Sequence, residues 1–92
     1  MVYIDSLDSS LNDLLKFYNC KDCRFVNFIV IKDEEKFFDY LFKKNDKIVV
    51  IISPQRGYLV NLLKDLASRK GKTVHVLLSS QLNENTCVVC FC

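Results

Sequence analysis

The residues Lys47-Ile48-Val49-Val50-Ile51-Ile52 decide the fold that this sequence predicts. An unbroken run of β-branched residues is typical of a strand that is covered on both faces of a sheet. Ser53-Pro54 then predicts the start of a helix, with serine as N-cap and proline at the first helical position, and Gly71 is the expected C-cap. The apolar run Thr73–Leu78 predicts the next strand. Because a strand, a crossover helix and another buried strand form a right-handed βαβ unit, this segment predicts parallel pairing.

The flanking segments continue the alternation of strands and helices. They comprise, in chain order, a short strand Val2–Ile4, a helix Leu7–Tyr18, a central strand Phe25–Ile31, a helix that Asp33 caps, and a last strand Thr86–Cys92. The connection before the last strand is too short for a full crossover helix, so we expect an antiparallel edge strand there. The chain is long enough for one domain, residues 1–92. The expected fold is α/β, with three layers (α/β/α) and a mostly parallel, Rossmann-like sheet of about four to five strands.

Composition narrows the classes of function. The net charge of +2 comes from 13 basic and 11 acidic residues, and this near balance gives no general footprint for polyanion binding. No apolar run approaches the ~20 residues needed to cross a bilayer, and the N-terminal residues lack the basic region of a signal peptide. We therefore expect a cytoplasmic protein with no membrane partner. Five cysteines beside abundant Lys, Val and Ile would suit a hyperthermophilic archaeal host, and a short cysteine-rich chain would equally suit a virus.

Polar residues at the predicted strand ends are the candidates for a ligand site, because ligands bind beyond the carboxyl ends of parallel strands. The residues Ser53, Gln55, Arg56 and Gly57 follow the most certain strand. Free N–H groups of a helix N-terminus and an exposed Arg56 could hold a phosphate there. The alternative is that these residues are ordinary caps and turns.

Asp5 and Asp33 also stand at predicted strand ends, and their carboxylates are weaker candidates for catalysis and for binding a divalent metal. No other cofactor is expected.

The segment Met1–Leu7 resembles the opening of PIN-type nuclease domains, a hydrophobic strand that ends in a metal-binding aspartate. The segment Lys47–Cys92 is similar to the second half of the related NYN branch, in which a strand ends in a serine and a later strand carries Gly-Lys-x-Val, here Gly71–Val74. Where the family has acidic residues after that serine, this chain has Pro54–Gly57, so only Asp5 matches. The resemblance implies a PIN-like fold and a short, degenerate, catalytically silent relative of metal-dependent ribonucleases.

The cysteines form two CxxC pairs, Cys20–Cys23 and Cys87–Cys90. Four thiolates can hold zinc. Side chains alternate along a strand, however, so Cys87 and Cys90 are expected on opposite faces, which disfavours a shared metal. Buried free thiols or one structural disulfide are the favoured alternatives. His75, the single histidine, lies mid-strand opposite the face of its valine neighbours and is expected to be structural.

Three functions remain open. The first is a nucleic-acid-associated, PIN/NYN-like protein that binds RNA and is not an efficient enzyme. The second is a homodimeric interaction module, in which the predicted edge strand Cys87–Cys92 pairs across a two-fold axis. The third is a nucleotide or phosphate binder that uses Ser53–Gly57.

Overall fold

The computed structural model of the protein describes the backbone of residues 2–7 and 22–91, and the side chains of residues 22–91. The strands are β1 (Val2–Leu7), β2 (Asp22–Asn27), β3 (Lys47–Ile52), β4 (Thr73–Ser79) and β5 (Thr86–Phe91). The α-helices are α2 (Glu34–Lys44) and α3 (Leu59–Lys70), and two short 3-10 helices are η1 (Phe28–Val30) and η2 (Pro54–Arg56).

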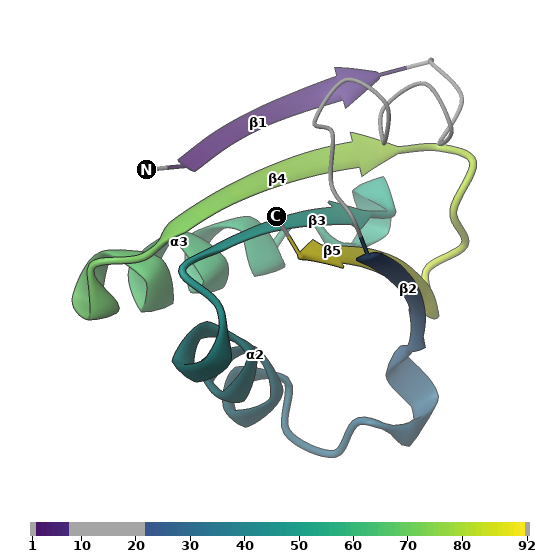
Figure 1. The fold of residues 1–92 in the computed structure, drawn as a ribbon. Coiled ribbons are helices and arrows are strands. Elements are labelled where there is room, and N and C mark those ends of the chain that lie inside the picture. The colour runs from purple at the N-terminus through teal and green to yellow at the C-terminus, as the bar shows by residue number, and fades with distance from the viewer. Residues whose placement is uncertain (1, 8–21, 92) are drawn as a thin grey trace.

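The described strands form one five-stranded sheet in the order β1-β4-β3-β5-β2 (Figure 1). The β3-α3-β4 unit has the expected parallel pairing, and β1 also lies parallel to β4. The two remaining pairings, β3 with β5 and β5 with β2, are antiparallel. The sheet is therefore mixed, with two parallel and two antiparallel strand pairings. The expectation of a mostly parallel, Rossmann-like sheet is wrong.

The last strand is antiparallel as expected, but it is not an edge strand. β5 lies between β3 and β2, with hydrogen-bonded neighbours on both sides. Its four central residues, Cys87 to Cys90, are all buried. A strand that is apolar on both faces is most stable in the middle of a sheet. There, neighbouring strands pair with both of its edges, and both of its faces are buried.

The edge strand next to β5 is β2. We expected this part of the chain to form a central strand that runs from Phe25 to Ile31. The strand ends at Asn27, whose side chain accepts a hydrogen bond from the Ile29 N–H and so caps η1. This local hydrogen bond replaces the continuation of the strand. Phe25, the only Phe in β2, is 71% exposed.

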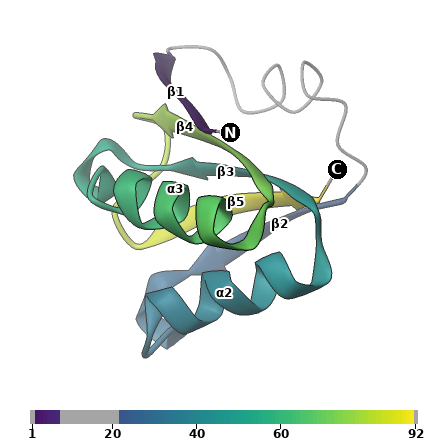
Figure 2. The same ribbon diagram turned by 90° about the vertical axis from the view of Figure 1, so that its left-hand side faces the viewer.

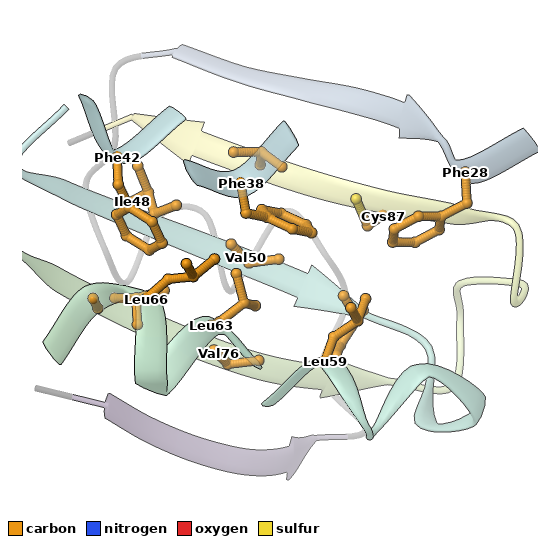
Figure 3. Close-up of a cluster of buried hydrophobic side chains, with 14 residues drawn as sticks. Phe28, Phe38, Phe42, Ile48, Val50, Leu59, Leu63, Leu66, Val76 and Cys87 are labelled. Carbon is orange, nitrogen blue, oxygen red and sulfur yellow. The ribbon is translucent and has the colours of Figure 1, made fainter. Parts of the chain in front are cut away.

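Both described helices cover the same face of the sheet (Figure 2). α2 begins at its N-cap Asp33 and α3 ends at Gly71, where φ is +66°, as the local sequence predicts. Buried side chains from both helices meet alternate residues of the three central strands (Figure 3). The larger members of this core are Phe28, Phe38, Phe42, Ile48, Val50, Ile52, Leu59, Leu63, Leu66, Val74, Val76, Cys87 and Val89.

The opposite face of the sheet is also apolar and buried. It carries Val49, Ile51, Leu77, Val88 and Cys90, with Leu82 from the loop after β4. This explains the unbroken apolar run of β3, since both sets of alternating residues are covered. The expected helix Leu7–Tyr18 lies outside the described residues except for Leu7, which ends β1.

Candidate functional site

The Ser53–Gly57 segment is a tight turn whose N–H groups are used within the turn. η2 begins after Ser53, and the hydroxyl of Ser53 accepts from the N–H of Gln55. The N–H of Arg56 donates to the Ser53 carbonyl at 2.9 Å, and that of Gly57 to Pro54 at 3.1 Å. Ser53 is an N-cap and Pro54 a first helical residue, as predicted, but they begin the 3-10 helix η2, and the α-helix starts only at Leu59. Gly57 has helical φ and ψ and lies before α3, so its glycine costs no α-helix stability there.

Arg56 lies at the centre of a cluster of five residues, Phe28, Glu34, Arg56, Tyr58 and Glu84, which we call the Arg56 cluster. Its Nε–H donates to the main-chain oxygen of Glu84 at 2.6 Å, and Nη1 donates to Glu34 Oε1 at 3.0 Å. The guanidinium carbon lies 4.2 Å from the centre of the Phe28 ring. Tyr58 completes the cluster by donating its hydroxyl to Glu34 at 2.9 Å.

These contacts join segments that are distant in sequence: η1, the first turn of α2, η2 and the β4–β5 loop. The Arg56 side chain is only 19% exposed and that of Glu34 25%. The expectation of an exposed Arg56 is therefore wrong. Its guanidinium is committed to an ion pair, a carbonyl and an aromatic ring, so the geometry gives it a structural role.

The two candidate aspartates occupy different kinds of position. Asp33 is the N-cap of α2 and accepts from the Lys36 N–H at 3.1 Å. Asp5 lies inside β1, opposite Leu77 of β4, rather than at the end of its strand. Among the residues whose side chains the structure describes, no three acidic, histidine or cysteine side chains come together as metal ligands.

The cysteines of the two CxxC pairs separate across the sheet. Cys23 of β2 and Cys90 of β5 are direct cross-strand partners and form a disulfide, with their Cα atoms 4.0 Å apart. Cys87 is buried on the helix-covered face beside Phe28 (Figure 3), so it cannot join Cys90 at one metal. The alternation expected along this strand is confirmed, and so are the favoured alternatives of one structural disulfide and a buried free thiol, whereas the disfavoured four-cysteine zinc site is excluded for these three residues. Cys20 lies outside the described residues.

Burial raises the pKa of the Cys87 thiol to about 12. Since the thiolate is the reactive form, we expect Cys87 to resist iodoacetamide in the native protein at mildly alkaline pH. Peptide mass spectrometry should find Cys87 alkylated only after unfolding in guanidinium. Rapid labelling of native Cys87 would contradict the buried position on the helix-covered face.

His75 lies in the middle of β4, paired with Val49 of β3 on the face opposite Val74 and Val76, as the alternation predicts. Partial burial lowers its pKa below the usual value, with a smaller contribution from the charge of Lys47. Both effects favour the neutral imidazole of His75. It does not belong to the Arg56 cluster.

The feature that the sequence-based interpretation missed is the outer edge of β2. Among the described strands, none pairs with the outer side of β2. Three large apolar side chains on β2 and on η1, which follows it in the chain, are exposed: Phe25 (71%), Ile29 (73%) and Val30 (76%). An edge of this kind can accept another strand. The available signal was the polar and charged residues Asp22, Arg24 and Asn27, which are more typical of an outer strand than of a central one.

Within the described part of the chain, no helix is long and apolar enough to cross a membrane.

Comparison with known proteins corrects the PIN/NYN interpretation. No curated protein and no solved structure matches the chain significantly. The family model that matches is a domain of unknown function, DUF4898, over residues 10–88. Together with the mixed sheet, this match overturns the resemblance to PIN-like nucleases, whose strand and helix pattern many α/β proteins share. Since the matched region spans most of the sequence, the chain belongs to the DUF4898 family.

Proposed function

We propose that this domain is a protein-interaction module that functions as a homodimer, joined through the outer edge of β2. The observation that carries the proposal is the exposed apolar group Phe25, Ile29 and Val30 beside a strand with no described neighbour on its outer side. Most exposed apolar residues are scattered, whereas these three gather on two consecutive elements, β2 and η1. Pairing of two such edges would add main-chain hydrogen bonds and bring the exposed Phe25 side chains of the two copies together.

The phosphate-binding alternative has less support from the same structure. A phosphate ligand at Ser53–Gly57 would need free N–H groups and a free guanidinium. The N–H groups of Gln55, Arg56 and Gly57 donate within η2, and Arg56 donates to Glu34 and Glu84. Binding there would have to break contacts that hold four segments together.

The substitution Phe25→Asp tests the dimer. It places a carboxylate in the middle of the β2 edge, where pairing of two copies would bring two like charges directly opposite each other. We expect light scattering of the unchanged protein at micromolar concentration to give about twice the chain mass of 10.7 kDa, and the variant to give the chain mass.

The matched control is Tyr40→Asp, which places the same charge on an exposed aromatic of α2 instead of β2. This control should remain dimeric. Circular dichroism should confirm that both variants are folded. A monomeric unchanged protein, or equal dissociation by both variants, would rule out dimerisation through β2.

A further inference from the structure

Alternate residues of β2 direct their main-chain N–H and C=O groups toward the outer edge of the sheet. Cys23 and Cys90 are directly opposite, with Cα atoms 4.0 Å apart, and such a short separation marks a pair that does not exchange hydrogen bonds. The adjoining Phe28 N–H donates inward, to the carbonyl of Asn85, at 2.7 Å. In an antiparallel ladder the inward and outward residues alternate. The N–H and C=O groups of Cys23, Phe25 and Asn27 therefore point away from β5, toward the outer edge.

This inference rests on the proposed homodimer and specifies its geometry. We propose that two copies pair their β2 strands antiparallel, with the two-fold axis at Phe25 and perpendicular to the sheet. Phe25 then faces the partner's Phe25, and Cys23 faces the partner's Asn27. Every one of these residues has outward main-chain groups, so the pairing forms about six main-chain hydrogen bonds. The sheet continues from one copy into the other.

The geometry of a two-fold axis excludes half of the registers. Residues that face each other in an antiparallel pair have their side chains on the same side of the sheet. A two-fold axis perpendicular to the sheet leaves each side chain on the same side of the sheet. Since side chains on one side are an even number of positions apart along a strand, the sequence numbers of two facing residues must differ by an even number. An axis that falls between two residues of β2 would instead place side chains of opposite faces side by side. The axis must therefore pass through a residue.

Charge and overlap then select Phe25. An axis at Arg24 would bring two guanidiniums directly opposite each other, which is destabilising. An axis at Cys23 or at Val26 would overlap only three of the six residues of β2. The axis at Phe25 overlaps five residues, from Cys23 to Asn27, and places Arg24 opposite the partner's Val26. It also stacks the two exposed Phe25 rings on one face, a favourable cross-strand aromatic pair.

Photo-crosslinking tests this register. p-Benzoylphenylalanine in place of Phe25 retains an aromatic ring at an exposed position, so the fold should be unaffected, as circular dichroism can verify. Isotope-labelled and unlabelled chains are mixed in equal amounts, irradiated and digested, so that mass spectrometry recognises cross-links between copies. We expect position 25 to join the partner's residues Arg24 to Val26. The same photoreactive residue in place of Tyr40 should give no cross-link between copies.

The outcomes separate the register from the dimer itself. A dimer whose cross-links centre on the partner's Cys23 would have its axis at Arg24, and the proposed register would be wrong. A dimer that gives no cross-link from position 25, or gives one to another element, would overturn both the register and the β2 interface, and only the dimeric state would remain. A monomer by light scattering would overturn both.

Discussion

Reduction of the Cys23–Cys90 disulfide is expected to lower the free energy of unfolding by about 4 kcal/mol. The bond joins residues 67 positions apart and closes a loop that includes most of the described chain. In the chain-entropy account, a cross-link over so long a loop strongly restricts the unfolded ensemble, and that restriction disappears on reduction. The disulfide also fastens the outer strand β2 to the central strand β5, so β2 should lose order first.

Urea unfolding with and without dithiothreitol measures this effect. The oxidised protein should have the higher midpoint, and the variant Cys23→Ala/Cys90→Ala should be insensitive to the reductant. The variant will also lose packing at the buried Cys90, which lowers its free energy of unfolding independently of the disulfide. Each protein is therefore compared with itself, with and without the reductant. An unchanged midpoint for the reduced, unsubstituted protein would show that this bond does not stabilise the fold. Formation of the bond requires an oxidising compartment or a host interior that tolerates disulfides.

The substitution Arg56→Ala is expected to destabilise the protein by about 2–3 kcal/mol. It removes charge-assisted hydrogen bonds to Glu34 and to the Glu84 carbonyl, and it uncovers the Phe28 ring. The carboxylate of Glu34 keeps the Tyr58 hydroxyl as a donor, which limits the loss. Because the Arg56 and Glu34 side chains are mostly buried, solvent screens their interaction less than it screens a surface pair.

Arg69→Ala is the matched control, because Arg69 also forms two ion pairs, with Asp65 at 2.8 Å and Glu35 at 3.5 Å, but is 57% exposed. We expect this variant to lose less than about 1 kcal/mol. Arg56→Lys should fall between the two, since lysine keeps the charge but not the planar fork that meets two acceptors. Chemical unfolding of the three variants measures the order. Equal stability of Arg56→Ala and Arg69→Ala would mean that the Arg56 cluster does not hold the segments together.

The features that the sequence predicted well depend on neighbours along the chain. The unbroken run of β3, the cap at Asp33 and the left-handed residue Gly71 were all placed correctly. Each one follows from local rules: apolar runs, hydrogen bonds to the first free N–H groups of a helix, and the absence of a Cβ at positive φ. The parallel pairing of β3 and β4 was also within reach, because a single helix connects them.

Local rules could not predict the order of the strands in the sheet or the hydrogen-bond partners of Arg56. The apolar residues of β5 are equally consistent with an edge strand and with a place between β3 and β2. Arg56 follows a strand as a phosphate-binding arginine would, yet its acceptors come from residues 22 and 28 positions away. The sequence alone therefore determined the strand β3, the N-cap of α2 and the C-cap of α3, since each depends on residues close together in the chain, but it misplaced the bounds of β2 and the start of α3. Only the tertiary structure decided which strand is exposed and which charges are paired, because those depend on contacts between residues distant in the chain.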